Sequence, residues 1–187
     1  MIPIRNKKKT LEVTVEEMRN FAFRYIEKYA PSKQQLKTYL LKKYLKASVP
    51  NVKKQDVTNL IDVVLEDLEK NKFINDKFYS DSKAKSMVRR GNSINKIRSY
   101  LIGKGINDEF IKHAVNKIQD QNSDQDFFSA LKICKKKRIG PARTESNRPL
   151  FYKKDISLLA RNGFDFETSR KVMDIKKEDF DKIVKLF

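Results

Sequence analysis

The sequence predicts an all-α protein in which three tandem three-helix repeats stack into an elongated, curved array. An internal duplication is the first reason, because a serine is twice followed by apolar residues at plus four and plus eight and by lysine at plus eleven. The two copies, 61 positions apart, are Ser32, Leu36, Leu40 and Lys43, and then Ser93, Ile97, Leu101 and Lys104. Repeated helical units must stack to bury their apolar stripes. The second reason is that five glycines and five prolines leave few tight turns for a many-stranded sheet.

Apolar periodicity and capping residues divide the chain into five segments. The expected divisions are a flexible basic arm over 1–13, repeat 1 over 14–72, repeat 2 over 73–121, repeat 3 over 122–175 and a C-terminal capping helix over 176–187. The arm is expected to be flexible because it shows no helical period and holds three consecutive lysines, Lys7–Lys9.

In repeat 1, three residues indicate where helices start. Thr14, with Glu17 three residues later, predicts a reciprocally capped first helix. Ser32 with Gln35 predicts a second helix of the same kind. Asp56 is expected to cap a third helix, whose apolar face follows a 3.6-residue period.

Repeat 2 follows the same plan. A helix is expected to begin at Asn75 or Asp76 and to end at Gly91, since glycine commonly follows a helix end. Ser93 is expected to cap the second helix and Asn107 the third.

Repeat 3 is a divergent copy. At a shift of 58 positions, Asp155 stands where Ile97 would fall, so a charge replaces an expected core residue. Residues 141–149 are expected to form an exposed loop, and the next helix is expected over 150–162.

The net charge of +18, from 42 Lys and Arg against 24 Asp and Glu, is the main clue to a partner. Basic residues are in excess in the first, middle and last parts of the chain. A spread positive charge suits a long anion, such as a nucleic acid or a filament that contains one. Solubility alone is the alternative explanation.

The reactive side chains give little support to catalysis. Cys134 has basic neighbours that favour a reactive thiol, but its apolar position favours a core residue, which we expect. His113 is the single histidine, and with no second histidine or cysteine nearby it predicts no zinc site. The sequence has no phosphate-binding glycine loop and no nucleophile elbow. We therefore expect no enzyme activity, no cofactor and no metal.

The pattern of apolar residues argues against a membrane protein. No apolar run approaches the roughly 20 residues that span a bilayer, and the first residues lack the apolar core of a signal peptide. With a single cysteine the chain forms no internal disulfide. We expect a reduced, soluble, cytoplasmic monomer.

Binding of a polyanion is better supported than catalysis. One basic cluster belongs to the middle repeat and comprises Arg89, Arg90, Lys96, Arg98 and Lys104. A second lies at a helix end and in the following loop and comprises Lys135, Lys136, Lys137, Arg138 and Arg143. The helix start after Gly91, beside Arg89 and Arg90, is expected to seat a phosphate or a carboxylate. The alternative for each cluster is a solvated helix face. Most tyrosines and phenylalanines fall on or beside inward stripes, so core packing is expected of them rather than base stacking.

Residues of the middle repeat are the most recognisable part of the chain. They are Leu68, Phe73, Ile74, Asn75, Asp76 and Phe78, then Arg89, Arg90, Gly91, Ser93 and Ile97, then Leu101, Lys104, Gly105 and Ile106. Two further elements are Leu159–Phe164 and the opening set Pro31, Ser32 and Leu36. In these residues the chain resembles the RecX family of recombinase regulators, over residues 15–175. Tyr79 and Asn162 depart from the residues usual in that family.

The resemblance implies a fold, partners and a role. RecX proteins consist of three tandem three-helix repeats, bind the RecA filament on single-stranded DNA, lie in its groove and limit its extension. They thereby damp strand exchange, ATP hydrolysis and the co-protease activity of the SOS response. Several also bind DNA directly, which makes duplex DNA a further expected partner. On this basis the ten basic residues of the two clusters are expected to contact the filament or its DNA.

A RecA-independent helical module that binds DNA or RNA is the main alternative. A helix pair that begins after Ser32 or Ser93 resembles a helix-turn-helix in outline. Base reading requires one helix with polar side chains that reach into a groove, and no helix of the sequence carries a clear set of this kind.

Overall fold

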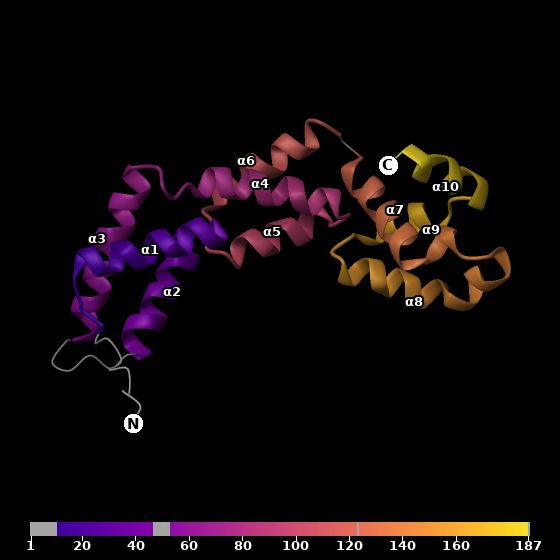
Figure 1. Cartoon of the computed structure of the whole chain (residues 1–187). Helices are drawn as coiled ribbons and strands as arrows, with labels where there is room; N and C mark the ends of the chain where they lie inside the picture. Colours follow the sequence, from indigo (N-terminus) through magenta and orange to yellow (C-terminus); the bar gives the residue numbers. More distant parts are fainter. Residues whose placement is uncertain (1–10, 47–52, 123, 187) are drawn as a thin grey trace, which may run out of the picture. The chain divides into compact units, whose positions relative to one another are not determined.

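The computed structural model describes residues 11–46, 53–122 and 124–186, and these residues are all-helical (Figure 1). They form ten α-helices and three short 3₁₀ helices, with no β-strand among them. The predicted all-α class is thereby confirmed. The predicted basic arm lies outside the described residues except for residues 11–13, which carry no helix. Three repeats in a curved array stay a prediction.

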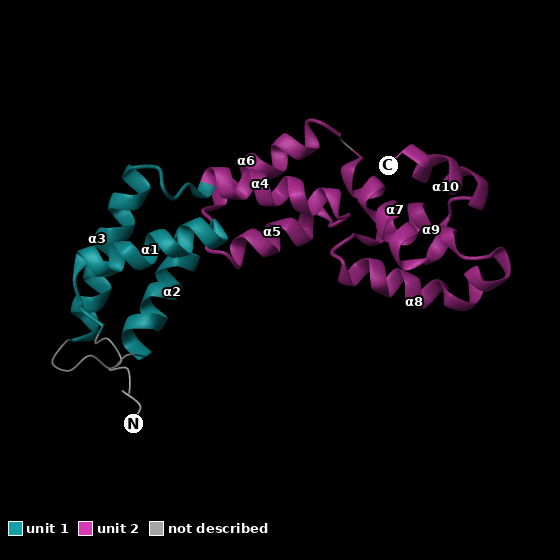
Figure 2. Cartoon of the chain, viewed as in Figure 1, with its two compact units in different colours: residues 1–76 teal, residues 77–187 magenta. Residues whose placement is uncertain are grey.

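The chain divides into two compact units, residues 1–76 and residues 77–187 (Figure 2). Unit 1 contains α1 (Val15–Tyr29), α2 (Lys33–Lys46) and α3 (Lys54–Lys70). The three helices pack around one apolar core, whose fully buried members include Met18, Leu36, Leu40, Ile61 and Leu65. These are the inward positions of the predicted stripes, so the helical period placed them correctly.

Two of the predicted caps in unit 1 form as expected. The Gln35 N–H donates to Ser32 Oγ (3.2 Å), and the Ser32 N–H donates to Gln35 Oε1 (3.1 Å), which completes the capping box of α2. Thr14 Oγ1 accepts from the Glu17 N–H at the start of α1 (3.2 Å). The carboxylate of Glu17 is not reciprocal, because it accepts from the Glu12 N–H instead.

The prediction that Asp56 caps α3 is wrong. The helix begins at Lys54, and Lys53 occupies the capping position without a side-chain hydrogen bond. The Lys53 carbonyl already accepts from the N–H groups of Asp56 and Val57, which places Asp56 inside the first turn. Negative charge is favoured there as well as at the cap, so residue type alone did not separate the two positions.

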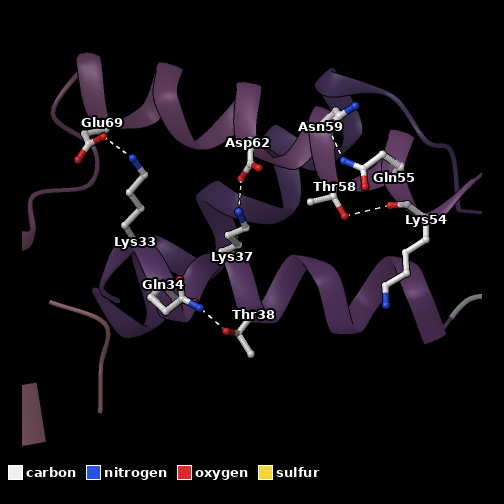
Figure 3. A network of polar contacts seen from close by, with 10 residues as sticks. All are labelled: Lys33, Gln34, Lys37, Thr38, Lys54, Gln55, Thr58, Asn59, Asp62 and Glu69. Atoms are coloured by element: carbon white, nitrogen blue, oxygen red, sulfur yellow. Dashed lines mark hydrogen bonds and ion pairs between the residues drawn. The ribbon is translucent and has the colours of Figure 1, made fainter. Parts of the chain in front are cut away.

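Ion pairs join the two lysines of the first half of α2 to α3. Lys33 pairs with Glu69 and Lys37 with Asp62, as Figure 3 shows. The positive charge of this side of α2 is therefore neutralised within unit 1.

Unit 2 carries the remaining helices, of which α4 begins at the last residue of unit 1. The helices are α4 (Asp76–Arg89), α5 (Ile94–Ile102), α6 (Asp108–Gln119), α7 (Gln125–Lys137), α8 (Arg148–Arg161), α9 (Phe166–Met173) and α10 (Lys177–Ile183). Ser93 and Asn107 cap α5 and α6 as predicted, since their side chains accept from the N–H groups of Lys96 and Glu109. Two apolar cores form, one among α4–α6 and one among α7–α10.

Partly buried polar contacts join these two parts of unit 2. Ser93 Oγ donates to the Asn162 carbonyl at the end of α8 (2.8 Å). Asp126 Oδ1, in the first turn of α7, accepts from the Ile94 N–H at the start of α5 (2.8 Å). Gly163 has φ +86°, and a Cβ there would lie 2.5 Å from Ser93 Oγ, so no other residue fits this junction.

The same capping arrangement occurs in unit 1. The Lys33 N–H, at the first residue of α2, donates to Asp76 Oδ1 (2.9 Å), as the Ile94 N–H does to Asp126. Because Lys33 and Ile94 each follow the capping serine of the duplicated pattern, the duplication seen in the sequence extends to local hydrogen bonding.

The exposed loop predicted over 141–149 forms only in part, because residues 144–147 and 149 are exposed but the segment is not wholly loop. Short 3₁₀ turns occupy Gly140–Ala142 and Glu145–Asn147, and α8 already begins at Arg148. Pro141 is buried, and the carboxylate of Asp155 (1% exposed) binds this segment from α8. A long-range ion pair between two residues of a divergent repeat left no local signal in the sequence.

Candidate nucleic-acid interface

The end of α4 and the second half of α7 line one basic pocket in unit 2. Its volume is about 580 Å³, and its lining residues are Arg89, Arg90, Lys132, Lys135 and Lys136. We call this site the α4–α7 basic pocket. Members of the two basic clusters that the sequence suggested are therefore brought together, although they lie more than 40 positions apart in the chain.

Gly91 explains why α4 and α7 approach so closely at the pocket. It ends α4 with φ +81°, and a Cβ at this position would lie 3.0 Å from the Ser129 carbonyl oxygen and 3.1 Å from Lys132 Cβ. Glycine meets both requirements, since it tolerates the left-handed backbone and has no side chain. The two arginines that precede it are thereby held beside the lysines of α7.

The basic side chains of the pocket differ in their exposure and in their hydrogen bonds to the rest of the fold. Arg89, Arg90 and Lys136 are exposed. Arg90 donates from Nε and Nη2 to the backbone carbonyl and the hydroxyl of Ser86, which orients its guanidinium. Lys135 Nζ donates to the Val184 carbonyl (2.8 Å). Arginines that are partly oriented and still exposed suit the recognition of phosphate oxygens.

Lys132 is a pocket residue that sequence reasoning missed. It stands between two buried positions, Leu131 and Ile133, and was not part of a basic run. Helical spacing would have identified it, because Lys135 and Lys136 follow at plus three and plus four and share its helix face.

The remaining residues of the first cluster lie elsewhere in unit 2. Lys96 Nζ donates to Asn162 Oδ1 (3.0 Å), and Lys104 Nζ lies 5.2 Å from the centre of the Tyr100 ring. Arg98 is exposed on α5. These three residues are not among the described residues that line the α4–α7 basic pocket.

The predicted anion seat at the start of α5 is occupied by a carboxylate of the chain itself, so it is not open to a phosphate. The Ile94 N–H already donates to Asp126, and the Lys96 N–H donates to Ser93 Oγ. Burial raises the pKa of Asp126 above its usual range, against the opposing effects of the Ile94 hydrogen bond and the positive charge of Arg98. A carboxylate of the same chain thus takes the place that the sequence suggested for a ligand.

The second cluster divides between α7 and a structural ion pair. Lys137 is exposed, as is Arg138, which ends α7 in the left-handed conformation with φ 53°. Arg143 instead donates from Nε and Nη2 to the two carboxylate oxygens of Asp155 (2.7 and 3.0 Å). Its guanidinium also lies 4.3 Å from the centre of the Phe151 ring. Its charge is therefore already paired within the fold.

The hydrogen bonds around Asp155 agree with an ion pair between Asp155 and Arg143. Burial alone would raise the pKa of Asp155, but hydrogen bonds from Arg143 and from the Gly140 N–H outweigh it, so the pKa lies below its usual range. The carboxylate is consequently ionised and paired at neutral pH.

Cys134 and His113 show no arrangement for catalysis among the described residues. Cys134 is fully buried, and burial raises the pKa of its thiol to about 12, so the expectation of a core residue is confirmed. His113 is exposed, with Nδ1 3.4 Å from Asp81 Oδ1. No group of three or more potential metal ligands occurs in the part of the chain that the structure describes.

None of the helices within residues 11–46, 53–122 and 124–186 has both the length and the apolar character that crossing a bilayer demands.

Comparison with known proteins gives a consistent result. The chain matches no family model. It is 30% identical over 172 residues to the regulatory protein RecX of Myxococcus xanthus (strain DK1622), a match that covers 91% of each chain. A crystal structure of RecX from Lactobacillus salivarius has a TM-score of 0.61 at 17% identity and covers 90% of this chain and 97% of that one. A second crystal structure of a regulatory protein RecX has a TM-score of 0.58 at 18% identity and covers 86% of this chain and 74% of that one.

Proposed function

The chain belongs to the RecX family of regulatory proteins, and from this premise we propose that it regulates the RecA recombinase by binding the RecA filament on single-stranded DNA. Bound stoichiometrically and without catalysis, it inhibits filament extension, and with it strand exchange, ATP hydrolysis and co-protease activity. It acts as a cytoplasmic monomer in homologous recombination, DNA repair and the SOS response. The match to a regulatory protein along nearly the whole chain is the observation that carries this proposal.

The α4–α7 basic pocket supplies the contact with phosphates. Five basic residues from α4, its end and α7 line it, and the exposed arginine pair among them supports binding of phosphate oxygens. Lys137 and Arg138 extend the positive surface past the end of α7, and Lys96, Arg98 and Lys104 add weaker contacts on α5 and just after it. We leave Arg143 out of the interface, because Asp155 already pairs its charge.

Charge also explains how such a protein finds its target. The net charge of +18 attracts a polyanionic filament over distances comparable to the screening length, about 8 Å at physiological salt. Many exposed, screened contacts give an affinity that falls as salt increases. Inhibition should therefore weaken steeply with ionic strength.

A RecA ATPase assay on single-stranded DNA tests the proposal. Titration of the protein should lower ATP hydrolysis, and the double variant Arg89→Gln with Arg90→Gln should need a much higher concentration for the same effect. Lys112→Gln with Lys182→Gln is the matched control, since it removes the same charge from exposed, ion-paired lysines on α6 and α10. Circular dichroism verifies that both variants stay helical.

Two results would contradict the proposal. No change in ATP hydrolysis at any ratio of protein to RecA would reject the regulation of RecA. An equal loss of inhibition in both double variants would reject the pocket as the binding site and would attribute binding to net charge alone. Tighter binding to bare DNA than to the filament would favour the RecA-independent module.

A further inference from the structure

A row of aromatic rings and lysines lies between α1 and α2 in unit 1. The Tyr25 and Tyr39 rings stack face to face, with centres 4.1 Å apart and planes 12° from parallel. The Tyr29 ring continues the row, 4.8 Å from Tyr25 and tilted by 46°. Lys28 Nζ lies 5.2 Å from the centre of the Tyr29 ring. We call Tyr25, Tyr29, Tyr39 and Lys28 the tyrosine seam.

The rings of the seam are not fully buried, although Tyr25 and Tyr39 pack against the apolar core of unit 1. Tyr29 is 54% exposed, and Tyr25 and Tyr39 are only partly buried. Tyr44, one turn after Tyr39, is a true core tyrosine at 2% exposed. Stacking between α1 and α2 thus leaves ring surface in contact with water.

Further lysines lie on the same side of α2 as the seam. Lys42, Lys43 and Lys46 follow Tyr39 at plus three, plus four and plus seven, so they share its face of α2. Lys43 Nζ lies 3.8 Å from the centre of the Phe21 ring, beside the seam. α2 contains no acidic residue, and the carboxylates of α3 pair with Lys33 and Lys37 on its other side (Figure 3).

We propose that the tyrosine seam is a second nucleic-acid site, at which bases of single-stranded DNA stack on Tyr29 and Tyr39 while Lys28 and Lys43 contact the phosphates. Alternating aromatic rings and cations are the arrangement by which proteins hold single strands without reading their sequence. Lys28, which lies over the Tyr29 ring, gives way to a base there and turns to the phosphates. The choice of DNA over RNA rests on the proposed function.

A duplex does not fit this chemistry. Its bases are already stacked on one another and offer no free ring face, whereas its phosphates still attract lysines. The seam should therefore prefer a strand with accessible bases, and the α4–α7 basic pocket should show no such preference.

Binding without RecA tests the seam directly. Fluorescence anisotropy compares a labelled oligothymidylate with an abasic strand of the same length and charge. The intact protein should bind the strand with bases about tenfold more tightly, and Tyr29→Leu with Tyr39→Leu should abolish this preference. The control Phe166→Leu removes a similarly exposed ring, 67% exposed, from α9 and should leave the preference intact.

Tyrosine emission provides an independent measurement, because the chain has seven tyrosines and no tryptophan. Bases that stack on the seam should quench this emission. The triple variant Tyr25→Phe, Tyr29→Phe and Tyr39→Phe keeps the rings, so it should bind the strand normally but lose most of the quenching.

The outcomes separate this inference from the proposed function. Equal affinity of the intact protein for both strands would refute the seam, and so would a base preference that survives in the leucine variant. Arg89→Gln with Arg90→Gln should weaken binding of both strands alike and leave the preference unchanged. Since RecA is absent from these assays, a negative result leaves the regulation of RecA untouched.

Discussion

Replacing Asp155 by asparagine should destabilise unit 2 strongly. The carboxylate is 1% exposed and accepts three hydrogen bonds, from the Gly140 N–H (2.8 Å) and from Arg143 Nε and Nη2 (2.7 and 3.0 Å). An asparagine has one acceptor oxygen, so its amide group must face a donor from Gly140 or from Arg143. At least one hydrogen bond and the whole ion pair are lost.

The magnitude follows from the burial of the two partners. Breaking a buried ion pair on one side costs about 3–5 kcal/mol. The Arg143 side chain is 22% exposed and can turn partly to water, which places Asp155→Asn near the lower limit, at about 3 kcal/mol. For a chain of this size, that loss lowers the midpoint of thermal unfolding by roughly 6–12 °C.

Urea denaturation followed by circular dichroism measures the loss, and pH dependence identifies its source. Because the folded-state pKa of Asp155 is lowered, its contribution is fully present above the unfolded-state value of about 3.9 and disappears as the pH falls through the lower folded-state pKa. The stability difference between the intact protein and Asp155→Asn should shrink over that acid range.

A paired substitution completes the test. Asp155→Leu with Arg143→Met should recover only the part of the loss that comes from the unpaired arginine, since apolar residues can replace a buried ion pair but leave the Gly140 N–H without its acceptor. If Asp155→Asn unfolds within about 0.5 kcal/mol of the intact protein, the ion pair does not hold this part of the fold.

Three further predictions concern the region of the α4–α7 basic pocket. Gly91→Ala should lower the free energy of unfolding by about 2 kcal/mol, because the added Cβ meets the Ser129 carbonyl and Lys132 at a positive φ. An unchanged midpoint in urea denaturation would contradict the close approach of α4 and α7. Arg138→Gly should raise the free energy of unfolding by about 1 kcal/mol, since glycine adopts the left-handed backbone without strain. The same variant should weaken inhibition of RecA, and unchanged inhibition would show that Arg138 is not part of the interface. Thiol reagents should modify Cys134 far more slowly in the native state than in urea, and equal rates would show that the thiol is accessible.

Local features of the fold were predictable from the sequence. Ser32, Ser93 and Asn107 cap helices as predicted because a cap depends on residues within one turn of each other. The apolar stripes placed Leu36 and Leu101 in cores for the same reason, since helical periodicity is a local property.

Features that depend on distant partners were not predictable. Asp126 binds a group 32 positions away, and Asp155 binds groups 12 or more positions away. No neighbouring residue in the sequence indicates these partners. The convergence of Arg89 with Lys136 likewise requires α4 to meet α7. The exposure of Tyr29 depends on how α1 and α2 pack, which a stripe of apolar residues does not specify.

The way in which Asp126 completes the start of α5 has a consequence for dissecting the molecule. A fragment that stops at residue 121 keeps every residue of α4, α5 and α6 but loses the carboxylate that accepts from the Ile94 N–H, and it uncovers Gly91. The Ile94 N–H would then depend on water for its hydrogen bond, and the start of α5 would lose the contact that fixes it to α7. Truncation experiments should therefore keep residues 77–187 together, since the helices on either side of residue 123 complete one another.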